Sequence, residues 1–174
     1  CGTVPGTSNV NLPAGTTVAN AVMSSLAANG SICVVSNDAV QVIVDIVGYL
    51  PPGTTMTALP PARLLDSRPT AANPADDGVN TVRPAGSITQ VQVTGRGGVA
   101  AGAQAAVLNV AAVGPSANGY LTVFPCDQAQ PNSSNLNYVA GISRANQVVV
   151  KLPTSGPNTG KVCIFTSQQT NLIA

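Results

Sequence analysis

Residues 134–137 read Ser-Asn-Leu-Asn, and residues 8–11, near the other end of the chain, read Ser-Asn-Val-Asn. The similarity continues on the C-terminal side of both segments at the same separation of 126 positions. The further matches are Ala14-Gly15 with Ala140-Gly141, Ala19-Asn20 with Ala145-Asn146, Val22 with Val148, and Leu26 with Leu152. A match held over this length predicts an internal repeat of one structural unit.

The match resumes after four extra residues in the second copy. Gly30-Ser31-Ile32-Cys33-Val34-Val35 then corresponds to Gly160-Lys161-Val162-Cys163-Ile164-Phe165, and Val42-Ile43 corresponds to Leu172-Ile173. Cys1 falls opposite Cys126 when a shift of one position is allowed. Both cysteines of one copy therefore have counterparts in the other, which strengthens the repeat.

The repeat predicts how the chain is organised. Residues 1–50 read as the C-terminal half of a first unit, and residues 51–62 read as a linker rich in proline, glycine and threonine. Residues 63–174 read as a second unit. The first copy goes on through Asp45-Ile46-Val47-Gly48-Tyr49-Leu50, which has no counterpart after Ala174, so we expect the second unit to lack its last strand. We also expect a mature or excised piece, because no signal peptide is visible.

Composition favours β-structure. The 174 residues include no glutamate, histidine or tryptophan, whereas glycine, proline, threonine, serine, asparagine and valine are abundant. These are residues of strands and turns rather than of helices. The strand candidates are Val18–Asn29, Ile32–Ser36, Val40–Tyr49, Ser87–Val93, Ala105–Val113, Tyr120–Phe124, Asn135–Val139, 147–153 and Val162–Thr166. Many short strands with turn signals between them predict an all-β protein, an antiparallel β-sandwich of jelly-roll or immunoglobulin-like type.

A resemblance to a known kind of module rests on a series of short motifs in this chain. They are Arg63-Leu64-Leu65-Asp66-Ser67-Arg68, Ala106-Val107-Leu108-Asn109-Val110, Gly119-Tyr120-Leu121-Thr122-Val123-Phe124-Pro125-Cys126, Ser134-Asn135-Leu136-Asn137-Tyr138, Lys161-Val162-Cys163-Ile164 and Val44-Asp45-Ile46-Val47-Gly48-Tyr49. Together they resemble a repeat module of secreted and cell-surface proteins of actinobacteria and related bacteria, over nearly the whole chain. The resemblance implies an extracellular setting, in tandem arrays or attached to exported proteins. It carries over no catalytic residue.

Four cysteines in such a chain predict disulfides. Of the three possible connectivities, the repeat favours Cys1 with Cys33 and Cys126 with Cys163. Buried free thiols are one alternative. A zinc site is disfavoured because there is no histidine and no closely spaced cysteine pair, and a lipid-modified Cys1 is disfavoured by its match to Cys126.

The sequence offers little material for catalysis. Without histidine or glutamate we expect no enzyme active site and no cofactor. Asp66 and Arg68 are two positions apart, so a structural ion pair is expected there. Asp45 lies among apolar residues and is expected to be partly buried with a hydrogen-bonding partner. Asp76-Asp77-Gly78 is interpreted as a solvated turn, with a calcium loop as the alternative.

Charge and aromatic content limit the possible partners. Only 7% of residues are charged and 3% are aromatic, and the net charge is +1, so neither a nucleic-acid surface nor a membrane span is predicted. Asn135, Asn137 and Tyr138 form a possible ligand face, although asparagine side chains also satisfy turn backbones. Low charge leaves copies of the chain free to associate.

Two functions remain as expectations. The first is an extracellular structural module that self-assembles head-to-tail, in which Asp45–Leu50 of one copy completes another by strand exchange. The second is a carbohydrate- or cell-wall-binding module, which requires an exposed aromatic platform. The five aromatic residues lie in strand-like contexts expected to be buried.

Overall fold

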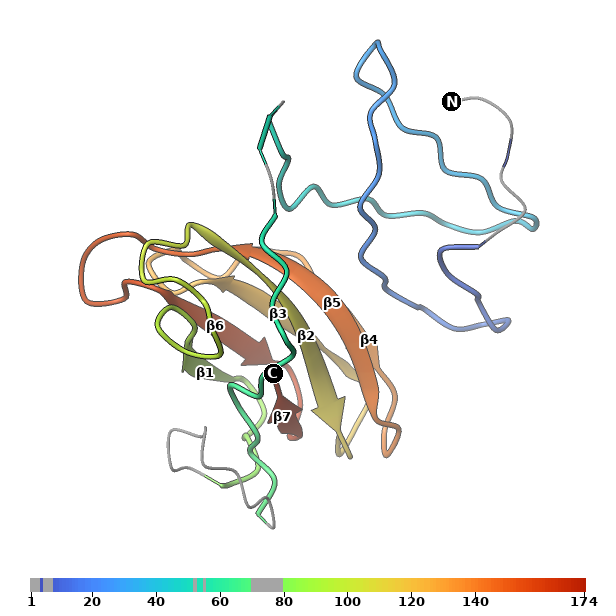
Figure 1. The fold of residues 1–174 in the computed structure, drawn as a ribbon. Coiled ribbons are helices and arrows are strands. Elements are labelled where there is room, and N and C mark those ends of the chain that lie inside the picture. The colour runs from blue at the N-terminus through green and yellow to red at the C-terminus, as the bar shows by residue number, and fades with distance from the viewer. Residues whose placement is uncertain (1–3, 5–7, 52, 55, 70–79) are drawn as a thin grey trace.

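The structure is a computed structural model that describes residue 4 and residues 8–51, 53–54, 56–69 and 80–174. Its strands form a β-sandwich in the C-terminal half of the chain (Figure 1). The seven strands are β1 (Ser87–Gln92), β2 (Ala105–Val113), β3 (Gly119–Pro125), β4 (Leu136–Tyr138), β5 (Arg144–Lys151), β6 (Lys161–Thr166) and β7 (Asn171–Ile173). Among the described residues no helix is long and apolar enough to cross a membrane.

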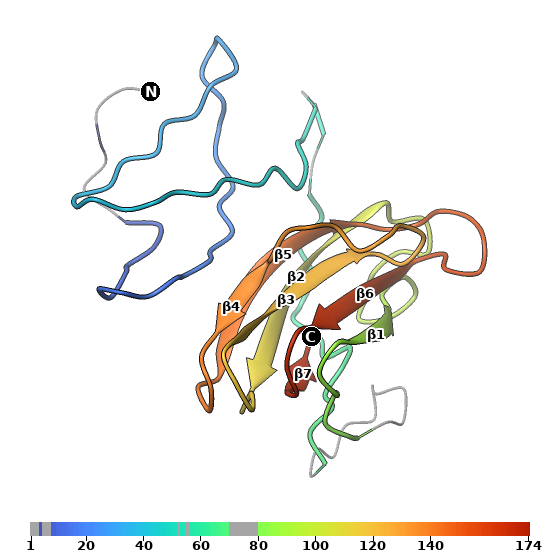
Figure 2. The same cartoon turned by 180° about the vertical axis from the view of Figure 1, so that it is seen from behind.

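The strands form two sheets. One sheet has four strands in the order β1-β6-β3-β4, and the other has three in the order β5-β2-β7. Every strand pairing is antiparallel. Figure 2 shows the same sandwich from behind, with β6 and β1 side by side. The predicted all-β, antiparallel sandwich is therefore confirmed.

Alternation of side chains explains how β2 is placed. Ala106, Leu108, Val110 and Ala112 are buried, whereas most of the residues between them are exposed or half-buried. Successive side chains of a strand point to opposite faces, so β2 presents one apolar face to the core. Its partner β5 lies in register along nearly its whole length.

The strand β3 is buried on both faces from Leu121 to Phe124. Leu121 and Val123 point into the core, and Thr122 and Phe124 are also buried although they face outward. The segment 126–135 covers this outer face, because Thr122 Oγ1 donates to the carbonyl of Ser133 at 2.6 Å. The outer face of the four-stranded sheet is thus closed beside β3.

The start of the second unit is joined to its end. The backbone N–H of Ala174 donates to the carbonyl of Leu65 at 3.0 Å, and the N–H of Leu65 donates to the carbonyl of Ala174 at 2.9 Å. The N–H of Leu172 donates to Ser67 Oγ at 2.7 Å. Leu64 and Leu65 are buried in the core. Residues 64–67 therefore run along the outer side of β7. Asp66 and Ile173 form an isolated antiparallel bridge there.

Strand prediction succeeded in the second unit and failed in the first. All six strands predicted between residues 87 and 166 are present, with ends shifted by at most three positions, and β7 is added. The described residues of 4–62 contain no strand, so the strands predicted at Val18–Asn29, Ile32–Ser36 and Val40–Tyr49 are wrong for this structure. A strand needs a neighbour for its backbone groups, and none of the described residues of 4–62 pairs with a strand of either sheet.

Candidate functional site

Residues 40–50 expose a series of large apolar side chains. Ile43 and Ile46 are each 86% exposed and Tyr49 is 79% exposed. Figure 1 shows the chain up to residue 50 in open loops beside the sandwich rather than within it. Contiguous exposed apolar side chains are a common feature of interaction surfaces. The predicted strand-exchange segment, Asp45–Leu50, lies entirely within this exposed stretch.

Asp45 differs from its prediction. It is exposed, as are all its neighbours from 41 to 50, so the expected partial burial is wrong. The reason is that no strand among the described residues pairs with this segment.

A pair of asparagines makes the same hydrogen bond in each of the two segments that match in sequence. Asn146 Nδ2 donates to the carbonyl of Asn135, and Asn20 Nδ2 donates to the carbonyl of Asn9, each at 2.5 Å. These are the positions that the sequence match places opposite one another. The two copies also touch here, because the N–H of Ala21 donates to Asn146 Oδ1 at 3.2 Å.

One turn occurs at equivalent places in both copies. The N–H of Thr16 donates to the carbonyl of Pro13, and the N–H of Ile142 donates to the carbonyl of Val139. The glycines within these turns, Gly15 and Gly141, have φ of +70° and +71°. Positive φ is readily adopted only by glycine, so the matched glycines fix the turns.

A second hydrogen-bonded turn is also found in both matched segments, and at Gly160 it encloses the four inserted residues. The N–H of Gly30 donates to the carbonyl of Ala27, and the N–H of Gly160 donates to the carbonyl of Pro153. Both glycines have positive φ. A Cβ at Gly160 would overlap Thr94, whereas one at Gly30 would meet nothing within 4 Å. The first copy thus keeps the local geometry of the second without the packing around it.

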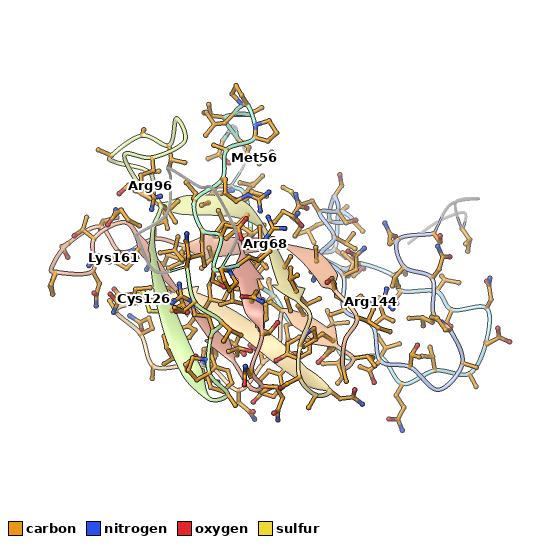
Figure 3. All side chains as sticks on the ribbon, turned by 90° about the horizontal axis from the view of Figure 1, so that it is seen from below. Met56, Arg68, Arg96, Cys126, Arg144 and Lys161 are labelled. Atoms are coloured by element: carbon orange, nitrogen blue, oxygen red, sulfur yellow. A yellow bond between two sulfur atoms is a disulfide. The ribbon has the colours of Figure 1, made fainter. Side chains whose placement is uncertain are left out.

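Disulfide bonds follow the predicted pairing where it is described. Cys126 and Cys163 are joined, with their Cα atoms 5.0 Å apart (Figure 3). The bond joins the end of β3 to β6. Cys33 is also disulfide-bonded, and its predicted partner, Cys1, lies outside the described residues. The cysteines in the described part of the chain are not free thiols. A structural disulfide indicates an oxidising environment.

The predicted ion pair between Asp66 and Arg68 is present and bidentate. Arg68 Nε donates to Asp66 Oδ1 at 2.9 Å and Arg68 Nη2 donates to Oδ2 at 2.6 Å. These bonds from Arg68 outweigh the opposing effect of burial and lower the pKa of the Asp66 carboxyl. The pair lies in the segment that closes the sandwich beside β7, so its role is structural.

The proposed ligand face is not one face. Asn135 Oδ1 accepts the N–H of Val123 at 2.6 Å, and Tyr138 is buried with its hydroxyl 2.9 Å from Thr166 Oγ1. Asn137 alone is half-exposed on the outer face of the sheet, where it pairs with Tyr120 in the register of β3 and β4. Asn135 and Tyr138 therefore serve the fold.

An aromatic pair that sequence reasoning missed lies beside Asn137. The rings of Tyr120 and Phe165 are 5.8 Å apart, and Tyr120 is 37% exposed. Both residues were expected to be buried. The alternation of β3 could have revealed this, because Tyr120 has the opposite parity to the apolar Leu121 and Val123.

No metal site is found in the part of the chain that the structure describes, since no group of three or more potential ligands lies together there. The predicted turn at Asp76-Asp77 lies outside the described residues. No protein-family model, curated protein or solved structure matches this chain.

Proposed function

We propose that this chain is an extracellular structural module that assembles with copies of itself, each copy completing a sheet of the next. The observation that carries the proposal is the exposed apolar stretch at residues 40–50, which includes Ile43, Ile46 and Tyr49. Fully burying a side chain such as isoleucine contributes roughly 1.5–3 kcal/mol. A partner that covers this stretch gains several such contributions at once.

Preformed local geometry supports the same proposal. The first copy already holds the bond from Asn20 to Asn9 and the turns at Gly15 and Gly30 that the folded second copy uses. A segment that keeps these features loses less conformational entropy when it enters a sheet. This favours assembly by addition of β-structure over assembly by a flat side-by-side contact.

The extracellular part of the proposal rests on chemistry and on resemblance. The Cys126–Cys163 bond requires oxidising conditions to persist. The motifs of the chain resemble those of secreted bacterial repeat modules, as described above. The net charge of +1 leaves weak repulsion between copies, which suits a tandem surface array or a filament.

The experiment is sedimentation of the purified chain over a wide concentration range, with electron microscopy of the same samples. We expect head-to-tail oligomers that grow with concentration and appear as filaments or sheets. Monomers alone at the highest concentration would contradict the proposal.

A carbohydrate-binding function is the second candidate, favoured by the aromatic pair of Tyr120 and Phe165 with the amide of Asn137 beside it. Sugar rings stack on exposed aromatic faces and take hydrogen bonds from amides. A glycan array probed with the chain and with the Tyr120→Ala variant tests it. Binding that the variant loses supports this candidate, and an absence of binding excludes it.

A further inference from the structure

The strand β2 has a full partner on one side and a short one on the other. β5 pairs with Ala105–Ala112, whereas β7 pairs only with Ala111–Val113. Within the described residues, no strand lies beside 105–110 on the β7 side of β2. The three-stranded sheet therefore has an open position directly beyond the end of β7.

Backbone geometry shows which groups point into this open position. The N–H of Leu152 donates to the carbonyl of Gln104 at 2.8 Å, so residue 104 directs its backbone toward the β5 side. The direction alternates along an antiparallel strand. Ala105, Val107 and Asn109 therefore direct their N–H and C=O groups to the open side, as an unpaired edge does.

The hydrophobic core is least covered at the same place. Ala106 and Leu108 are 9% and 8% exposed, the highest values in the core cluster. Val110 and Ala112 lie on the same face of the same strand, next to β7, and are 1% and 0% exposed. The core residues of β2 are therefore less exposed where β7 lies beside them than where it does not.

We propose that Asp45–Leu50 of a second copy occupies this open position as a strand antiparallel to β2. The register follows from the repeat, since Ile43 corresponds to Ile173 and Ile173 lies opposite Ala111. When this antiparallel register is continued along β2, Asp45 lies opposite Asn109 and Ile46 lies opposite Leu108. The inference rests on the proposed function and adds to it the acceptor surface and the register.

The side chains of Asp45–Leu50 suit the open position beside β2 at each inward-facing residue. In this register Ile46 and Leu50 face the core with Gly48 between them, and Gly48 lies opposite the small Ala106. Ile46 then covers Leu108, one of the two least covered core residues. The apolar side chains that face inward satisfy the alternation of a half-buried strand.

The outward-facing residues of Asp45–Leu50 and the course of the second copy's chain are also compatible with this position. Asp45 faces solvent beside the exposed amide of Asn109, which keeps its charge hydrated. Val44 corresponds to Ala174, a position that the acceptor chain already fills, so the donor chain leaves the sheet at that point. A head-to-tail contact of this kind adds one copy after another.

The test is a cysteine pair across the proposed register. In the full chain carrying Asp45→Cys and Asn109→Cys, mild oxidation should give a ladder of disulfide-linked oligomers on a non-reducing gel, because opposed residues lie within disulfide range. The matched control carries Asp38→Cys with Asn109→Cys, which moves the donor cysteine within the same exposed segment. We expect at least tenfold less cross-linking in the control.

Three results overturn the inference. Equal cross-linking in both variants shows that the donor segment does not occupy the open position beside β2. The same conclusion follows if neither variant cross-links while the unmodified chain still oligomerises in sedimentation. Both results leave the proposed function standing. A cross-link confined to monomers shows that the segment folds back onto its own chain. Monomers alone for the unmodified chain would remove the proposed function as well.

A second variant needs no introduced cysteine. Ile46→Asp places a charge at the inward position and should lower self-association at least tenfold, whereas Val35→Asp, on the same exposed half of the chain but outside the donor, should leave it unchanged. Both side chains are exposed in the single chain, so the unfolding temperature of the sandwich should not move in either variant. Unchanged association in Ile46→Asp contradicts the proposed register.

Discussion

Replacing Cys126 and Cys163 together by alanine should lower the free energy of unfolding of the sandwich by about 4 kcal/mol. The bond closes a loop with a sequence separation of 37, and loss of such a closure costs about that much through the added freedom of the unfolded chain. A domain of this size has a total stability of only about 5–15 kcal/mol. Thermal unfolding should therefore shift down by roughly 15–25 °C.

Calorimetry of the variant against the native chain measures this effect. The matched control is the double substitution of Cys1 and Cys33 by alanine, which removes the cysteines of the first copy. Because Cys33 lies where the chain has no strand and little burial, the control should change the main unfolding transition by less than about 1 kcal/mol. A similar loss in both variants, or a loss below about 1 kcal/mol on removing Cys126 and Cys163, would refute the reasoning.

Three further substitutions test particular contacts. Because the pKa of Asp66 is lowered in the folded state, its contribution to the free energy of unfolding is present above the ordinary pKa of 3.8 and is lost as the pH falls through the folded-state pKa. In Asp66→Asn, the stability measured by acid unfolding should therefore depend less on pH. Gly160→Ala should destabilise the sandwich by more than the roughly 1–2 kcal/mol of positive-φ strain, because its Cβ also overlaps a side chain. Gly30→Ala carries the same backbone strain but lies outside the strands of the sandwich, so it should leave the melting temperature of the sandwich almost unchanged. Tyr138→Phe removes a buried hydroxyl and should cost about 1–3 kcal/mol in denaturant unfolding, and Tyr120→Phe, on the surface, should cost almost nothing.

Sequence patterns predicted the strands of the second unit well. β2 was predicted with its observed ends, because its run of small and branched apolar residues is bounded by turn signals. The pairing of Cys126 with Cys163 was predicted from the repeat alone. Both are properties of short segments or of a comparison within the chain, and neither requires knowledge of the neighbours in space.

The candidate surfaces were predicted less completely. Asp45–Leu50 was identified from the repeat, but the open side of β2 could not be, since nothing local distinguishes Ala106 from Ala112. Asn135, Asn137 and Tyr138 were grouped because they are adjacent in sequence. The structure separates them, because two are hydrogen-bonded within the fold and Asn137 alone faces outward.

The lack of glutamate, the abundance of strand and turn residues, the turn signals and the internal match were enough to establish the β-class, the strand positions between residues 87 and 166 and one disulfide. Tertiary structure alone decided which strands became neighbours, that 64–67 closes the sandwich beside β7, and that β2 keeps an unpaired stretch. The physical reason is that alternation specifies that a face will be buried but does not specify what buries it. That choice depends on many distant residues fitting at once.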